Sequence, residues 1–204
     1  MSGVLGVILA GGRSSRMGGG DKGLLALGGV RLIDRVVARL GPQCDGLALN
    51  ANGDPARFAD LGLPVLPDSV GGFAGPLAGV LAGLDHAAGA GFGHIVTAAA
   101  DTPFFPADLV VRLRTAAGPG GLALAASRDG EGQLWRHPTF GLWPVALRED
   151  LRAALEGGLR KIVAWTDSHG AGTAEFASAP FDPFFNVNTP EDLAEAETLL
   201  EAGP

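Results

Sequence analysis

Residues 4–10 form an unbroken nonpolar run that ends abruptly at Gly11-Gly12. A continuous run of this kind is typical of a strand that is buried on both faces, as strands are in a parallel sheet. It is too short to cross a membrane. We therefore expect a central parallel strand that leads into a loop at the edge of a sheet, which is where ligands bind in open α/β folds.

Strand-like and helix-like segments alternate along the rest of the chain. Further strands are expected at residues 46–50, 63–66, 93–100, 122–126, 139–143 and 173–177. Helices are expected at residues 32–40, 77–84, 107–116, 145–156 and 159–165, and from Thr189-Pro190 onward. No linker, repeat or block of like charge divides the chain. The alternation predicts a single α/β domain over residues 1–204, Rossmann-like and three-layered, with helices on both faces of a mostly parallel sheet.

The charge balance restricts the partners of the protein. Lys and Arg number 15 against 22 Asp and Glu, which gives a net charge of −7 over 204 residues. An acidic chain is a poor general binder of nucleic acid or of anionic membranes, so neither is expected as a partner. Cys44 is the single cysteine and cannot form an intrachain disulfide, and no signal peptide pattern precedes the first strand. We expect a cytoplasmic protein.

The segment after the first strand concentrates positive charge. Residues 1–23 contain Arg13, Arg16, Lys22 and one acid, a local charge of +2 that leaves −9 on the rest of the chain. Glycines in this segment allow backbone N–H groups to approach phosphate oxygens closely. The combination suits a polyphosphate ligand. A plain surface loop remains the alternative, because glycine-rich loops are common in a chain with 33 glycines.

Two well-known phosphate motifs do not fit this segment. Gly18, Gly20 and Gly23 have the spacing of the dinucleotide-binding motif, but they begin well after the strand, whereas that motif requires the strand-to-helix turn itself. A P-loop requires Ser or Thr directly after its Gly-Lys pair, whereas Lys22 stands between Asp21 and Gly23.

Two further segments carry oxygen ligands after apolar runs. Asp101 directly follows an expected strand, where a carboxylate is able to hold a Mg²⁺ that bridges triphosphate oxygens; a turn or helix-capping role is the alternative. Asn186 and Asn188 flank Val187 and point the same way on an extended segment, so one amide oxygen is able to complete the metal shell. Capping of the last helix by Asn188 or Thr189 is the alternative there.

Nine short motifs occur in order along nearly the whole chain. They are Leu9-Ala10-Gly11-Gly12, Arg16-Met-Gly, Asp21-Lys22-Gly-Leu-Leu, Asn50, Asp68-Ser69, Gly75-Pro-Leu-Ala-Gly79, Asp101-Thr-Pro103, His137-Pro-Thr139 and Asn186-Val-Asn-Thr-Pro190. Taken together they resemble the molybdenum cofactor guanylyltransferases, the MobA family. The opening motifs are shared by a wider set of nucleotidyltransferases, whereas the central and closing ones narrow the choice.

The resemblance implies a GT-A-like nucleotidyltransferase that is Mg²⁺-dependent. Its substrates would be GTP and molybdenum-molybdopterin, and its products a guanine dinucleotide cofactor and pyrophosphate. Proteins that deliver the cofactor or accept it would be further partners. By position, Leu9, Ala10, Gly11 and Gly12 would cradle the nucleotide, Lys22 would contact its phosphates, and Arg16 would assist. Asn50 and Asp68 would lie on the guanosine side. Asp101, with Asn188, would ligate Mg²⁺.

This chemistry requires no general base. The second pKa of a phosphate monoester is about 6, so the attacking oxygen is mostly ionised at neutral pH. Catalysis would depend on alignment of two anions and neutralisation of their charge. Two alternatives remain open: a related nucleotidyltransferase that uses CTP on the pterin or another nucleotide on a sugar phosphate, and a non-catalytic nucleotide-binding protein.

Overall fold

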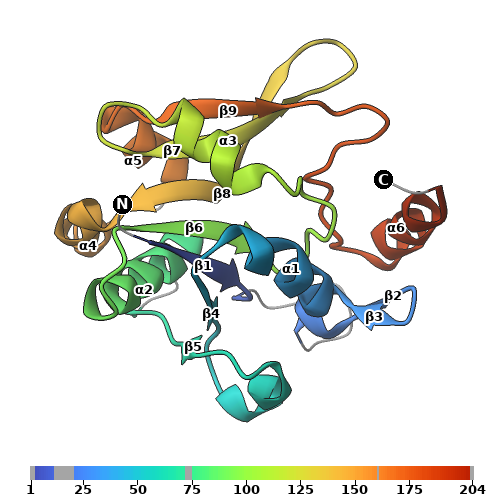
Figure 1. Cartoon of the computed structure of the whole chain (residues 1–204), viewed down its shortest axis with the longest axis horizontal. Helices are drawn as coiled ribbons and strands as arrows, with labels where there is room; N and C mark the ends of the chain where they lie inside the picture. Colours follow the sequence, from blue (N-terminus) through green and yellow to red (C-terminus); the bar gives the residue numbers. More distant parts are fainter. Residues whose placement is uncertain (1–2, 12–20, 72–74, 160, 203–204) are drawn as a thin grey trace.

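The computed structural model describes residues 3–11, 21–71, 75–159 and 161–202. Within this part of the chain, seven strands form one sheet in the order β5-β4-β1-β6-β8-β7-β9 (Figure 1). All neighbouring pairs are parallel except those of β8, which runs antiparallel to β6 and β7. The strands are β1 (Val4–Leu9), β4 (Gly46–Asn50), β5 (Val65–Leu66), β6 (His94–Ala99), β7 (Ala123–Arg128), β8 (Leu134–Pro144) and β9 (Gly172–Phe176). The prediction of an α/β fold with a mostly parallel sheet is confirmed.

Helices cover both faces of the sheet (Figure 1). One face carries α1 (Leu32–Leu40) and α3 (Leu109–Ala116), and the other carries α2 (Pro76–Gly89), α4 (Arg148–Glu156) and α5 (Ile162–Ser168). β1 is buried on both sides: Ile8 packs in the core under α1, and Val7 in the core under α2. The unbroken nonpolar run is explained by this position, because neither face of the strand meets water.

A smaller unit lies beside the sheet. The two-stranded hairpin of β2 (Ala26–Leu27) and β3 (Val30–Arg31) packs with α6 (Pro190–Ala202) around a third apolar cluster that includes Phe104. The sequence pattern does not predict this hairpin, since strands of two residues are too short to show a period. Four short 3-10 segments complete the described elements: η1 (Lys22–Leu24), η2 (Gly41–Gln43), η3 (Pro55–Leu61) and η4 (Val145–Leu147).

Several expected boundaries are displaced. β8 begins at residue 134 rather than 139, because residues 134–137 pair with β7 across a register shift that Pro138 obscures in the sequence. The helix expected at 145–156 divides into η4 and α4, the helix expected at 107 begins at 109, and the one expected at 159 begins at 162. Among the described helices, none has both the length and the apolar character that a membrane crossing requires.

Candidate active site

The carboxyl ends of β5, β4, β1 and β6 meet at one edge of the sheet, where they border a cavity of about 650 Å³. Leu9, Asn50 and Asp101 reach the cavity from three neighbouring strand ends, and Asp68 reaches it from the segment after β5. A smaller hollow of about 160 Å³ adjoins it and is lined by Ala10, Gly11, Lys22 and Asp101, among others. The predicted nucleotide-binding residues that the structure describes therefore line one continuous region.

Lys22, Asp101 and Asn188 converge although they are far apart in the sequence. Lys22 Nζ lies 4.0 Å from Asp101 Oδ2 and donates a hydrogen bond of 2.6 Å to Asn188 Oδ1. The side chains of Lys22 and Asp101 are each about a quarter exposed, so both are open to the cavity. Gly23 allows the lysine segment to approach β6, because an added Cβ would lie 3.2 Å from the Cβ of Ala100.

The surroundings of Asp101 shift the pKa of its carboxyl group. Burial raises the pKa of this carboxyl group, and the positive charge of Lys22 lowers it in partial compensation. The backbone carbonyl of Asp101 accepts a hydrogen bond of 2.9 Å from Val187 N–H, and the buried Thr102 hydroxyl donates to Asn186 Oδ1. Asp101 does lie in a turn, but its carboxylate faces Lys22 instead of capping a helix; Asp108 occupies the N-cap of α3.

A second polar group closes the other end of the cavity. Asn50 is 3% exposed, and its Nδ2 donates hydrogen bonds to Asp68 Oδ1 at 3.0 Å and to the Leu66 carbonyl at 3.1 Å. Asn52 Nδ2 donates to the other carboxylate oxygen of Asp68 at 2.8 Å. Gly79 of α2 makes room for this arrangement, since an added Cβ would lie 2.2 Å from Asn50 Oδ1. The last position of the Gly-Pro-Leu-Ala-Gly motif therefore requires glycine, because a side chain at Gly79 would collide with Asn50.

Asn52 and Arg57 are cavity residues that the sequence reasoning missed. Arg57, from η3, donates through Nε to Asp21 Oδ2 at 2.5 Å and so ties the nucleotide side of the cavity to the residue before Lys22. A signal for Asn52 is present in the sequence: Asn50-Ala51-Asn52 repeats the spacing of Asn186-Val187-Asn188 after a strand. Arg57 has no comparable signal, because its role depends on a contact with Asp21 across 36 positions.

The two asparagines near the C-terminus flank a buried Val187. Asn186 lines the large cavity, and Asn188 contacts Lys22. Of the two residues expected as possible caps of α6, Thr189 is the one that caps it: its Oγ1 accepts from Asp192 N–H at 3.1 Å, and Asp192 accepts from the Asn188 and Thr189 N–H groups. The amide side chain of Asn188 is therefore left to face the site. Gly12 and Arg16, both predicted site residues, lie outside the described residues.

The donor set suits a Mg²⁺ ion that arrives with a triphosphate. Among the described residues, no group of three or more His, Cys, Asp or Glu side chains gathers as a ready-made metal cage. Mg²⁺ commonly takes one or two carboxylates plus substrate phosphates and waters. Asp101 provides one such carboxylate at the cavity wall, and Asn188 Oδ1 retains a second lone pair beyond its bond to Lys22. The residues present fit this mode of binding.

His137 lies beside the cavity without lining it. Its Nε2 is 2.7 Å from the hydroxyl of buried Ser127, and its ring stacks on Phe184 with centroids 4.2 Å apart. Burial lowers the pKa of His137, and Asp182 opposes that effect. Phe184 is itself part of the core. The shift in register between β7 and β8 nearby places Thr139 at the cavity wall.

Comparison with known proteins shows the family of the chain. The family model of the MobA-like NTP transferase domain matches residues 6–171. A molybdenum cofactor guanylyltransferase from Mesorhizobium japonicum is 52% identical over 98% of this chain and 97% of its own length. Another from Nitrobacter hamburgensis is 51% identical over 95% of this chain and 93% of its own length.

Solved structures share the fold at lower identity. Molybdopterin-guanine dinucleotide biosynthesis protein A from Archaeoglobus fulgidus superposes with a TM-score of 0.69 at 24% identity, covering 97% of this chain and 99% of its own. A 4-diphosphocytidyl-2C-methyl-D-erythritolsynthase from Anaerococcus prevotii gives 0.71 at 13% identity, covering 97% and 98%. The GT-A-like nucleotidyltransferase fold is thereby confirmed. With relatives half identical over nearly its whole length, the chain belongs to the MobA-like NTP transferase family, among the molybdenum cofactor guanylyltransferases.

Proposed function

We propose that this protein transfers GMP from GTP to the terminal phosphate of molybdenum-molybdopterin, which yields a guanine dinucleotide cofactor and pyrophosphate. The observation that carries the proposal is the placement of Lys22 4.0 Å from Asp101 in a region whose far end is closed by the Asn50–Asp68 pair. One end suits phosphates and the other suits a base. The half-identical relatives are named molybdenum cofactor guanylyltransferases, which supports transfer of a guanylyl group to the molybdenum cofactor.

The reaction is a displacement at the α-phosphorus of GTP. A phosphate oxygen of the pterin substrate forms the new P–O bond, and the bond to the β-phosphate oxygen breaks, so pyrophosphate leaves with the electron pair. Because the monoester is already mostly ionised at neutral pH, no side chain has to remove a proton. The obstacle is repulsion between two polyanions. Lys22 and the backbone N–H groups at the end of β1 would offset it.

Divalent metal dependence is part of the proposal. Asp101 would hold Mg²⁺, with the amide oxygen of Asn188 as a second protein ligand, and the ion would neutralise charge on the triphosphate when bound. Lys22 donates to Asn188 and faces Asp101, so its ammonium group would contact phosphate oxygens beside the ion. Leu9, Ala10 and Gly11 would form the backbone wall of the phosphate position. The undescribed Gly12 and Arg16 are proposed to extend it.

Asp68 would recognise guanine. Asn50 and Asn52 each donate to one of its carboxylate oxygens, which fixes the carboxylate but leaves further lone pairs toward the cavity. A guanine base presents two adjacent N–H donors, at N1 and N2, to such a carboxylate, whereas cytosine presents one donor, its N4 amino group, beside an acceptor at N3. The arrangement therefore favours GTP over CTP.

The test is pyrophosphate release by the purified protein with Mg²⁺ and each of four nucleoside triphosphates, with and without molybdopterin. Release with GTP and pterin together is the expected result. Equal release with CTP would overturn the assigned base, and release from GTP that does not depend on the pterin would overturn the acceptor. GTP binding without any turnover would support the non-catalytic alternative.

Three further features complete the proposal. We propose a cytoplasmic location, because a chain with a single cysteine forms no intrachain disulfide, which suits a reducing compartment. Proteins that supply molybdenum-molybdopterin and accept the dinucleotide are proposed as partners, because the product is a cofactor for other enzymes. We also propose that residues 1–204 form a single nucleotidyltransferase domain.

A further inference from the structure

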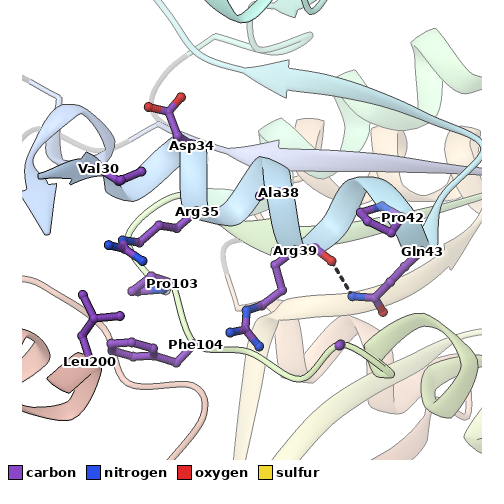
Figure 2. Close-up of a pocket in the computed structure, with 11 residues that line it drawn as sticks. Val30, Asp34, Arg35, Ala38, Arg39, Pro42, Gln43, Pro103, Phe104 and Leu200 are labelled. Carbon is purple, nitrogen blue, oxygen red and sulfur yellow. Dashed lines mark hydrogen bonds between the residues drawn. The ribbon is translucent and has the colours of Figure 1, made fainter. Parts of the chain in front are cut away.

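A second cavity of about 550 Å³ is bordered by Pro103 and Phe104, which follow Asp101 in the chain (Figure 2). We call it the α1–α6 pocket and define it by Arg35, Ala38 and Arg39 of α1, Pro103 and Phe104 after β6, and Leu200 of α6. Among the described residues, it shares no lining residue with the active-site cavity. Its volume lies in the range of small-molecule sites.

The pocket contains two arginines without a carboxylate partner. Arg35 and Arg39 are one helical turn apart, and Figure 2 shows both side chains directed from α1 toward Pro103 and Phe104. Among the described residues neither arginine forms an ion pair. Arg35 donates two hydrogen bonds to the Leu27 carbonyl, and Arg39 donates one to the Phe105 carbonyl. Asp34 also lines the pocket, but its carboxylate accepts two hydrogen bonds from Arg31, at 2.7 and 2.9 Å, and points away from Arg35 and Arg39 in Figure 2.

The two guanidinium groups repel each other, because both are positive and neither is paired with a carboxylate of the described residues. Burial lowers the pKa of Arg39, and the charge of Arg35 lowers it further. The guanidinium groups nevertheless stay charged, and each retains at least three N–H groups beyond the bonds just named. Such groups match the planar geometry of a carboxylate or a phosphate. An anion would relieve the repulsion and use the remaining donors.

Apart from Asp34 and Gln43, the other described residues that line the pocket are nonpolar. Phe104 is 5% exposed and packs edge-on against Phe181, so its ring is held in place. Pro103, Ala38 and Leu200 add aliphatic surface. Gln43 donates to the carbonyls of Arg39 and Pro106 and so ties α1 to the segment after β6. A few convergent polar groups on a preformed apolar wall are the usual composition of a small-molecule site.

We propose that the α1–α6 pocket binds a small organic anion in which a phosphate or carboxylate group, held by Arg35 and Arg39, is attached to an apolar body that contacts Pro103, Phe104 and Leu200. This ligand is separate from the two substrates. Because Pro103 and Phe104 follow Asp101 by two and three positions, an occupant would touch the back of the segment that presents Asp101 to GTP.

The test is isothermal titration of the full-length protein with four probes: 1-naphthyl phosphate, 1-naphthoate, inorganic phosphate and the neutral 1-naphthol. Both naphthyl anions are expected to bind with one site. Inorganic phosphate and naphthol are each expected to bind at least about tenfold more weakly, because phosphate lacks the apolar body and naphthol lacks the anionic group. Equal affinity for naphthol and naphthoate, or no binding of either anion, would overturn the proposal.

Variants locate the binding. Arg39→Gln and Arg35→Gln are each expected to weaken naphthoate binding at least about tenfold, because each removes a charge-assisted contact. Ala38→Phe leaves both arginines in place on an exposed helix position and fills the pocket, so it is expected to abolish binding. Arg148→Gln on α4 is the matched control and should stay within about twofold of the unchanged protein.

Lys22→Gln separates the two sites. Loss of naphthoate binding in Lys22→Gln, with retention in Ala38→Phe, would place the probe in the active site and overturn the proposal. Retention in Lys22→Gln with loss in Ala38→Phe supports it. Neither result depends on turnover, so the α1–α6 pocket stands or falls independently of the guanylyl-transfer proposal.

Discussion

At the scale of single residues, the chemistry of the site rests on few side chains. Asp101 is the carboxylate at the phosphate end, Lys22 lies 4.0 Å away, and Asn188 accepts a hydrogen bond from that lysine. The residue types were predictable from the sequence, because a carboxylate after a buried strand and a lysine in a glycine-rich segment have few other uses together. Their mutual distances were not, since they come from positions 22, 101 and 188.

Asp101→Asn is expected to lower turnover about a hundredfold or more while the fold is kept, because the substitution removes the negative ligand proposed for Mg²⁺ and retains the shape. The measurement is pyrophosphate release with GTP and molybdopterin. Asp108→Asn, an exposed carboxylate at the start of α3, is the matched control and should leave the rate unchanged. Near-normal turnover in Asp101→Asn would refute the metal assignment.

His137 provides a test of buried polar structure. Burial lowers its pKa from the ordinary value of 6.5, so its neutral form is favoured in the folded state. A histidine with a depressed folded pKa contributes stability above its unfolded pKa, and this contribution is lost as pH falls through the folded pKa. The stability advantage of the unchanged protein over His137→Gln should therefore shrink between about pH 7.5 and pH 5. Urea unfolding at both pH values measures it; a constant or growing gap would contradict the assignment.

At the scale of elements, the periodic patterns identified most strands and helices but not every boundary. The bounds of β4 agree with the pattern because its five residues end at a distinct loop, whereas β8 extends five residues earlier than expected. The added part of β8 is recognisable only from its pairing with β7. The β2–β3 hairpin and η3, which carries Arg57, lack any local period and became apparent only in three dimensions.

The prediction at the scale of elements concerns the close packing of α2 against Asn50 at the end of β4. Gly79→Ala would place a methyl group within 2.2 Å of Asn50 Oδ1, so Asn50 has to move away from Asp68. We expect weaker GTP binding, by about tenfold or more, and a loss of stability of about 1–3 kcal/mol from overpacking. Nucleotide titration and thermal unfolding measure the two effects.

Gly89→Ala is the control within the same helix. Nothing lies within 4 Å of the added Cβ, so helix propensity alone is altered and stability should be unchanged or slightly raised. If the two substitutions reduce GTP affinity equally, the steric explanation for Gly79 is wrong.

At the scale of the whole molecule, the order of the sheet creates the site. β5, β4, β1 and β6 are parallel neighbours, so the segments that follow them open on the same edge. The segment before α6 then returns to that edge and brings Asn186 and Asn188 to it, with Val187 N–H bound to the Asp101 carbonyl. The residues proposed to bind the phosphates and those proposed to bind the base are thereby held at the same edge of one sheet.

Removal of divalent metal tests whether a metal ion stabilises the fold or takes part only in the reaction. Lys22 already faces Asp101 and binds Asn188 through side-chain contacts, so no metal is needed to hold this region together. Treatment with EDTA is expected to stop pyrophosphate release and to leave the melting temperature unchanged, and added Mg²⁺ should restore release. A large fall in melting temperature with EDTA would instead indicate a structural metal.

The sequence by itself determined the local features of this protein: a buried parallel strand before a glycine-rich segment, the alternation that leads to an α/β sheet, and the residue types suited to phosphate and metal. These depend on neighbours a few positions away, whose periodicity is written directly in the chain. Only the tertiary structure decided which distant groups meet, including Lys22 with Asn188, Arg57 with Asp21, and Arg39 with the Phe105 carbonyl. Such meetings follow from strand order and long-range packing, which leave no local pattern.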